Sequence, residues 1–173
     1  MLPTVLDASR ALKSPGQRFP FEASGIEIEE LEVLDGPVQF TNVRLEGEML
    51  ATEDSVTLTG KLTAKAVTRC ARCLGRVVLP METEFREVFL REVKDDDPDS
   101  YPFTGSGVEL NEAAKNALLL ELPYRILCSE SCRGLCPRCG KNLNEGPCTC
   151  QEGDEVMNPF SALKAIVKDE EEV

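Results

Sequence analysis

Six of the chain's eight cysteines lie in one stretch, CSESCRGLCPRCGKNLNEGPCTC, which runs from Cys128 to Cys150. Its centre, Cys136-Pro137-Arg138-Cys139-Gly140, has the spacing of a metal knuckle, in which two thiolates close a tight turn on one ion. The glycine allows the left-handed backbone conformation that turns N–H groups toward sulfur. The stretch therefore predicts metal binding by thiolates.

The eight cysteines form four close pairs, which predict two sites of four thiolates each. Because the last four cysteines are closely spaced, they can complete one site among themselves, and the other four are then left for the second site. Mixed partitions remain open, since spacing alone does not fix connectivity. The predicted metal ligands are Cys70, Cys73, Cys128 and Cys132 for one site and Cys136, Cys139, Cys148 and Cys150 for the other.

We expect zinc, as two structural ions, with an iron–sulfur cluster or a redox-active dithiol as alternatives. The chain has no histidine, so each site must be all-thiolate unless a carboxylate or water joins it. A closed four-thiolate zinc has no open position for substrate, which favours a structural role. A disulfide framework is disfavoured because MLPTVLDASRALK lacks the apolar run of a signal peptide, which predicts a reducing, cytoplasmic location.

The formal net charge of the chain is −12. Such a protein is repelled by nucleic acid at long range, so contact with RNA needs a local basic patch or a basic partner. Two interpretations of the cations near the cysteines remain open: they neutralise zinc–thiolate centres, or they contact RNA or an acidic partner. These cations are Lys61, Lys65, Arg69, Arg72, Arg76, Arg133, Arg138 and Lys141. No apolar run approaches the roughly 20 residues of a membrane helix.

Hydrophobic periodicity predicts the elements that position the cysteines. Alternation indicates strands over 38–50, with a bulge near Thr41-Asn42, over 55–69, and from Arg76 onward. Cys70 and Cys73 would then lie at the tip of a β-hairpin. A helix is predicted over 112–122, with Asn111 as its N-cap. One mostly apolar face of this helix would lie on the sheet; it consists of Ala113, Ala117, Leu120 and Glu121.

These elements predict one α+β domain, built as an antiparallel β-meander or a barrel-like sheet with one packing helix. A C-terminal zinc-knuckle segment and a short terminal helix, beginning at Asn158-Pro159, complete it. We expect residues 1–37 to be an N-terminal lead-in with a possible edge strand, and 38–93 to be the antiparallel β region with its CxxC hairpin. An acidic connector follows over 94–107, and 108–173 hold the helix, the cysteine-rich segment and the final helix.

Several motifs occur together in this chain. They are Cys70-Ala-Arg-Cys73 after a β-rich region, a helix running into Leu122-Pro123, the block CRGLCPRCG from Cys132 followed by Asn142-Leu-Asn144, then Cys148-Thr-Cys150, and Asn158-Pro159-Phe160. In this combination the chain resembles the YceD family of bacteria and plastids, which is associated with accumulation of large-subunit ribosomal RNA. The resemblance covers roughly residues 20–167, and CRGLCPRCG is its most specific part.

The resemblance implies a cytoplasmic, non-enzymatic factor for processing or stable accumulation of large-subunit (23S) ribosomal RNA in ribosome biogenesis. Its implied partners are that RNA or its precursor particle, and also ribosomal proteins. It carries no catalytic residue over to this chain. One alternative is a zinc-shaped interaction module that docks a basic ribosomal protein or nuclease. The other, a thiol oxidoreductase using Cys70/Cys73 or Cys136/Cys139, is disfavoured because neither pair opens a helix and no histidine is present as a base.

Overall fold

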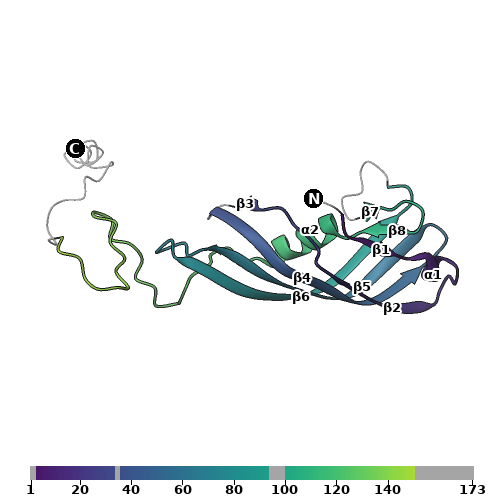
Figure 1. Cartoon of the computed structure of the whole chain (residues 1–173), viewed down its shortest axis with the longest axis horizontal. Helices are drawn as coiled ribbons and strands as arrows, with labels where there is room; N and C mark the ends of the chain where they lie inside the picture. The colour runs from purple at the N-terminus through teal and green to yellow at the C-terminus, as the bar shows by residue number, and fades with distance from the viewer. Residues whose placement is uncertain (1–2, 34–35, 94–99, 151–173) are drawn as a thin grey trace, which may run out of the picture. The chain divides into compact units, whose positions relative to one another are not determined.

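Three long strands form the centre of the fold: β4 (Gly36–Ala51), β5 (Ser55–Arg69) and β6 (Arg76–Leu90). They pair antiparallel in chain order (Figure 1). At one edge β2 (Arg18–Ser24) pairs antiparallel with β4, and at the other the short β7 (Ser100–Pro102) pairs in parallel with β6. The meander of β4, β5 and β6 is therefore as predicted. Within the described residues the sheet is mixed and open, so the barrel-like alternative is wrong.

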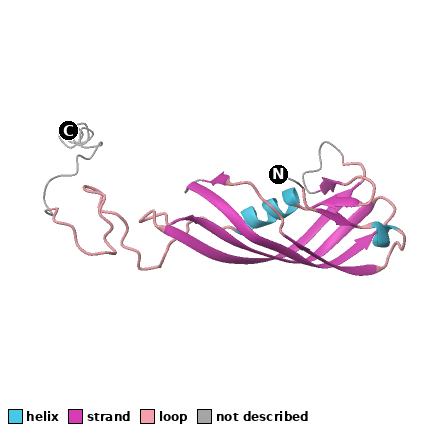
Figure 2. Cartoon of the chain, in the orientation of Figure 1, coloured by secondary structure: helices cyan, strands magenta, loops and turns pink. Residues whose placement is uncertain are grey.

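The computed structural model describes residues 3–33, 36–93 and 100–150. By their contacts, residues fall into two units, 1–132 and 133–173. The first also contains β3 (Leu31–Val33), which pairs with the start of β4, and a two-stranded sheet of β1 (Val5–Asp7) and β8 (Gly107–Glu109). The described helices are α1 (Ser9–Leu12) and α2 (Asn111–Glu121). Because both are short, the described part of the protein is mostly β (Figure 2). The predicted terminal helix lies outside the described residues.

The core lies between the long sheet and α2, which covers one of its faces (Figure 2). Along β5, buried residues alternate with half-buried or exposed ones, as the period of two predicts, and the buried set includes Val56, Leu58, Leu62, Ala64 and Ala66. The buried face of the helix matches the expected one only in part, since Ala113 is buried and Ala117 packs against the core, as expected. Its buried side chains are Ala113, Ala114 and Leu118, whereas Leu120 is 90% exposed.

The strands β4 and β5 approach each other very closely at Gly47 and Gly60, which face each other in the register. A Cβ atom at Gly60 would overlap the carbonyl oxygen of Glu46, and one at Gly47 would overlap that of Thr59. Only glycine fits at this crossing. Farther along the pair, the register shifts between Thr41 and Arg44, which confirms the predicted bulge.

Two further features differ from the expectation. The N-terminal lead-in, residues 1–37, supplies the strand β2, every residue of which pairs with β4. Phe21 of this strand lies opposite Gly47 and is buried in the core. Asn111 does not cap α2 with its side chain. Its Oδ1 instead accepts from the Thr4 N–H at 2.7 Å, and its Nδ2 donates to the Glu27 carbonyl at 2.6 Å, so it ties the N-terminal segment to the helix. None of the described helices is long and apolar enough to cross a membrane.

Candidate metal centres

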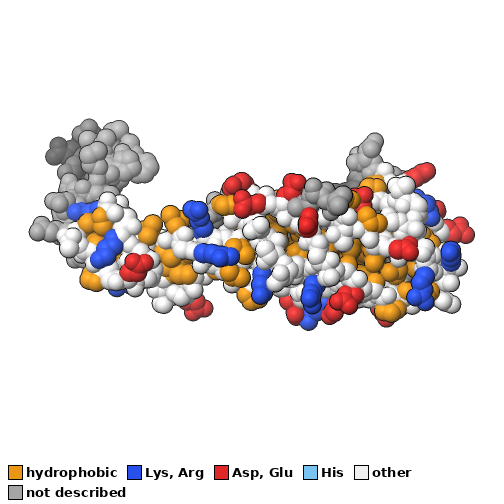
Figure 3. Space-filling model, in the orientation of Figure 1, with side chains coloured by type: hydrophobic (Ala, Val, Ile, Leu, Met, Phe, Trp, Pro, Cys, Tyr) orange, Lys and Arg blue, Asp and Glu red, His pale blue; other side chains and the backbone are white. Residues whose placement is uncertain are grey.

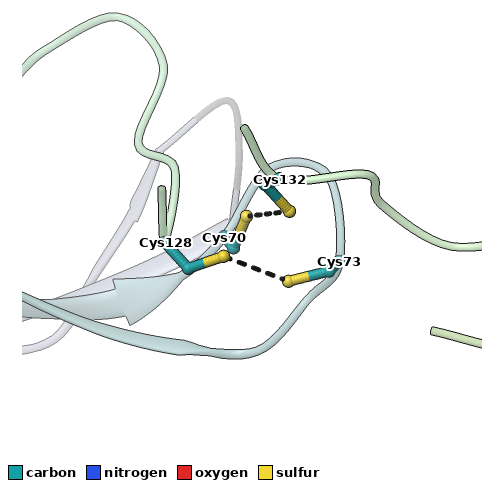
Figure 4. Close-up of side chains that lie close together, drawn as sticks. All are labelled: Cys70, Cys73, Cys128 and Cys132. Carbon is teal, nitrogen blue, oxygen red and sulfur yellow. Dashed lines mark hydrogen bonds between the residues drawn. The ribbon is translucent and has the colours of Figure 1, made fainter. Parts of the chain in front are cut away.

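The first cysteine cluster is built on the tip of the β5–β6 hairpin. Cys70 and Cys73 lie in the turn between the two strands, as predicted. Cys128 and Cys132 come from the segment that follows α2. The four side chains point toward one another (Figure 4). The Sγ atoms of Cys70 and Cys132 are 3.8 Å apart, and those of Cys73 and Cys128 are 3.6 Å apart.

The second cluster lies in residues 133–150 and consists of Cys136, Cys139, Cys148 and Cys150. The Sγ of Cys136 is 3.5 Å from that of Cys148 and 4.0 Å from that of Cys150. In each cluster all four sulfur atoms lie within 4.8 Å of one another. The structure therefore groups the eight thiols in the partition that the spacing favoured.

The sulfur separations fit one ion per cluster. Zinc bonds thiolate sulfur at about 2.3 Å, so the sulfurs of a tetrahedral site lie about 3.8 Å apart. The observed 3.5 to 4.0 Å agrees with that edge length. A disulfide would bring two sulfurs to about 2.0 Å, and all eight cysteines are free thiols. An iron–sulfur cluster would hold them farther apart, because several irons and sulfides lie between the cysteines. Each cluster could hold a metal ion.

Backbone hydrogen bonds shape the first cluster. The Cys70 N–H donates to the Gly75 carbonyl at 2.8 Å, and the Leu74 N–H donates to the Cys70 carbonyl at 2.9 Å. The later segment is fastened to this tip at two places. The Ala71 N–H donates to the Ile126 carbonyl at 2.9 Å, and the Arg72 guanidinium donates to the carbonyls of Cys132 at 2.9 Å and Glu130 at 3.2 Å.

The second knuckle repeats the turn of the first. The Cys136 N–H donates to the Lys141 carbonyl at 2.8 Å, and the Gly140 N–H donates to the Cys136 carbonyl at 2.9 Å. Polar contacts hold the loop that follows. Asn144 Oδ1 accepts from the Arg133 N–H at 2.8 Å, and Lys141 Nζ donates to the Pro147 carbonyl at 2.8 Å. Of the described residues after Cys132, only Gly134 and Cys136 are buried, so this segment has almost no apolar core.

The thiols within each cluster differ in acidity. Burial raises the pKa of Cys70, but the N–H groups of Cys73, Cys128 and Arg72 lower it more, to about 6. The N–H groups of Cys139 and Arg138 lower the pKa of Cys136 to about 6. Neighbouring thiols raise the pKa of Cys128 and Cys150 to about 12. Cys132 has the largest effect on Cys128, and Cys139 has the largest effect on Cys150. A bound cation would let all four thiols of a cluster ionise together.

The predicted RNA-contact residues differ in how far they are already engaged. Lys61 pairs with Glu82 at 2.7 Å. This hydrogen bond raises the pKa of Lys61, and the negative charges of Glu82 and Glu46 raise it further. Arg72 and Lys141 donate to carbonyls within their own units. In the described part of the chain no ion pair involves Lys65, Arg69 or Arg76, which all lie on the solvent face of the hairpin. Arg133 and Arg138 belong, with Lys141, to the unit of residues 133–173.

The sheet register reveals one cation that the sequence prediction missed. Arg44 lies on the exposed face of β4, opposite Thr63, which separates Lys61 and Lys65 on β5. It is distant from the basic run in sequence, so only strand pairing brings it beside that run. The same face is acidic toward the other end of the hairpin, where Glu46 lies opposite Lys61 and Glu84 lies opposite it on β6.

Comparisons with known proteins identify relatives over the region that carries both clusters. A family model described as "Large ribosomal RNA subunit accumulation protein YceD" matches residues 58–167. All eight cysteines lie within those residues. No solved structure matches the chain.

Bacterial relatives match along most of the chain. YlbN of Bacillus subtilis, an uncharacterized protein, is 27% identical over 165 residues, which are 91% of this chain and 93% of that protein. The uncharacterized protein Rv2926c of Mycobacterium tuberculosis is 26% identical over 155 residues, 84% of this chain and 73% of its own. A chloroplastic YCED homolog 1 of Arabidopsis thaliana, named as a large ribosomal RNA subunit accumulation protein, is 27% identical over 66 residues, 37% of this chain and 21% of its own.

Proposed function

The chain belongs to the YceD family, and on this premise we propose that it is a non-enzymatic factor for processing or stable accumulation of large-subunit (23S) ribosomal RNA. Family membership implies a role in accumulation of that RNA. The observation that carries the proposal is the family match over residues 58–167, which includes both cysteine clusters. We place this activity in the cytoplasm, on the RNA or on its precursor particle.

We assign each cluster one structural zinc ion. Four thiolates fill a tetrahedral ion and leave no position for substrate or for a reactive water. The first ion would be held by Cys70, Cys73, Cys128 and Cys132, and would fix the segment after α2 to the hairpin tip. The second would be held by Cys136, Cys139, Cys148 and Cys150, and would order residues 133–150. A thiol oxidoreductase that uses Cys70 and Cys73 has less support, because Cys70 is fully buried and Cys73 nearly so.

The RNA contacts in this proposal come from the basic residues near the clusters. The chain as a whole is acidic, so a local group of cations must meet the phosphates. Lys65, Arg69 and Arg76 are the best placed, since no described carboxylate pairs with them. Arg133, Arg138 and Lys141 would add contacts from the other unit, while Lys61 and Arg72 are already engaged.

Deletion of the gene in its own host tests the proposed function directly. We expect the ratio of mature 23S to 16S ribosomal RNA to fall and unprocessed 23S precursor to accumulate. The intact chain should restore the ratio, whereas a chain in which Cys70 and Cys136 are both serine should not. An unchanged ratio in the deletion strain, measured in exponential growth and under cold stress, would contradict the proposal.

A charge-reversal pair tests whether the hairpin contributes. Lys65→Glu with Arg69→Glu should reduce sedimentation of the protein with large-subunit precursor particles, with folding unchanged. The matched control is Arg18→Glu, which reverses a cation at the far end of the same sheet, where Arg18 pairs with Glu48 at 3.2 Å. If both variants sediment equally with the particles, the hairpin is not part of the contact surface.

A second candidate function is an interaction module that docks a basic ribosomal protein or a nuclease. Its support is the net charge of −12 together with carboxylates exposed on the outer face of the sheet, among them Glu46, Glu48 and Glu84. Such a contact would be salt-sensitive. A pull-down with and without ribonuclease separates the two functions, because a protein-mediated contact survives digestion of RNA and a direct RNA contact does not.

A further inference from the structure

The two knuckles close with the same pair of backbone hydrogen bonds, but the residue that follows the second cysteine differs between them. In each, the residue after the second cysteine donates its N–H to the carbonyl of the first cysteine at 2.9 Å. That residue is Leu74 in the first knuckle and Gly140 in the second. Both adopt the left-handed conformation, with φ of 59° for Leu74 and 71° for Gly140. The two positions are therefore structurally equivalent.

Leucine is a poor choice for this conformation. Its Cβ crowds the backbone when φ is positive, which costs free energy that glycine does not pay. Burial does not offset the cost, because the Leu74 side chain is 56% exposed. A bulky residue in this region is an outlier, and such outliers concentrate at functional sites. Leu74 thus weakens the turn that it occupies while presenting an apolar side chain to solvent.

A second unfavourable arrangement lies directly beside it. Arg69 and Arg76 face each other as the last pair of the β5–β6 ladder, and like charges in that position destabilise a sheet. None of the ion pairs in the described part of the chain includes either of them. Val78, two residues beyond Arg76 on the same face, is 49% exposed. Figure 3 shows Lys and Arg side chains next to hydrophobic ones over this end of the sheet.

We propose that Leu74 and Val78, together with Lys65, Arg69 and Arg76, form a recognition surface for an unpaired segment of RNA. This inference rests on the function proposed above and names the form of RNA that the hairpin tip binds. The cations meet the phosphates, which removes the repulsion between the two arginines. An unstacked base packs its flat face on Leu74 and Val78. Duplex RNA offers no exposed base face to these side chains, so unpaired RNA is the better match.

The test compares Leu74→Gly with a control that removes another exposed leucine, Leu120→Ala. The probe is a fluorescent oligouridine of about 12 nucleotides, whose binding is followed by anisotropy. Because glycine relieves the strain, Leu74→Gly should keep two zinc ions and melt at the same or a higher temperature. Its affinity for the oligouridine should nevertheless fall about fivefold, because the base loses its apolar contact with the leucine side chain. Leu120→Ala, which changes a residue on α2, should bind like the unaltered protein.

Two further arms complete the test. Arg69→Glu with Arg76→Glu should abolish binding and leave the zinc content unchanged. A duplex RNA of equal charge should bind more weakly than the oligouridine and should not distinguish Leu74→Gly from the unaltered protein.

Three results would overturn the inference. The first is Leu74→Gly losing zinc or stability while it keeps its RNA affinity, because Leu74 would then be structural. The second is the unaltered protein failing to bind oligouridine. The third is an acidic peptide displacing RNA at equal concentration, which would make the occupant a protein. The ratio of 23S to 16S RNA in the deletion strain is measured independently of these binding assays. The broader function can therefore stand even if the RNA-binding surface is wrong.

Discussion

The two cysteine clusters place the same turn on different supports. The first closes a hairpin whose strands continue into a core containing Leu58, Leu62, Phe85 and Phe89. The second lies in residues 133–150, where only Gly134 and Cys136 are buried among the described residues. An ion at the first cluster therefore adds to a fold that burial already stabilises. An ion at the second must supply most of the order itself, as in small metal-dependent domains.

This contrast indicates what an ion would do at each cluster. At the first cluster, the main effect of metal would be to hold the segment around Cys128 and Cys132 against the hairpin, beside the basic and apolar tip. At the second, the effect would be to create a fixed loop conformation where the chain is otherwise polar and short.

Loss of the second ion should produce the largest change. With Cys136 and Cys139 both replaced by serine, zinc content should fall from two ions to one. Structural zinc contributes about 10 kcal/mol or more to such segments, so residues 133–150 should lose their order. Hydrogen exchange followed by mass spectrometry should show those amides exchanging at the rate of an unfolded peptide, while β4 and β5 stay protected. Persistent protection of residues 133–150 would show that metal is not what orders them.

Loss of the first ion should have a smaller effect. Cys70→Ser should also remove one zinc, but the core should keep the sheet folded. We expect the melting temperature of the sheet to drop by about 10 °C. Exchange should increase at residues 126–132, which lose their attachment to the tip, and should stay unchanged at 133–150. Unfolding of the whole sheet in this variant would mean that the first cluster, too, is essential for its support.

Gly60→Ala should destabilise the sheet without affecting either cluster. The added Cβ would overlap the Glu46 carbonyl oxygen, so the two strands must separate. We expect a loss of about 2–3 kcal/mol in the free energy of unfolding, with both zinc ions retained. Gly25→Ala is the control, since Gly25 has a positive φ but open space around it, and it should cost only about 1 kcal/mol. Equal losses in the two variants would rule out the close approach as the cause.

Arg72→Met should have the smallest effect and should be confined to the first cluster. It removes the hydrogen bonds to the Cys132 and Glu130 carbonyls, which are worth about 1 kcal/mol in total at this exposed position. One of the two zinc ions should be released faster to a colorimetric chelator, and the other at an unchanged rate. Arg76→Met, which removes a cation without such bonds, should release both ions at the normal rate. Faster release of both ions from Arg72→Met would contradict the assignment.

The sequence was most informative where the signal is local. The period of two gave both ends of β5 and the first residue of β6, and the turn between them placed Cys70 and Cys73 at the hairpin tip. Cysteine spacing favoured the partition into two groups of four that the structure displays. Close spacing along the chain accounts for the second cluster. The first joins Cys73 to Cys128 across 55 residues and followed only because the other four thiols could complete a site among themselves.

Pairing between distant segments was beyond the sequence alone. Phe21 opposite Gly47 and the parallel strand at Ser100–Pro102 depend on strands separated in the chain. The fit between Gly47 and Gly60 joins consecutive strands, but it depends on their exact register. The helix face was wrong at Leu120 for the same reason, since the sheet selects which side is buried.

Eight thiols in four pairs beside a basic run can be recognised without any structure, because residue type and spacing are properties of the chain. Only the tertiary structure decided which cations are available. It pairs Lys61 with Glu82, directs Arg72 to backbone carbonyls and leaves Arg69 facing Arg76 beside an exposed Leu74. Charge and apolar surface act through the neighbours they meet in space, and strand register sets those neighbours.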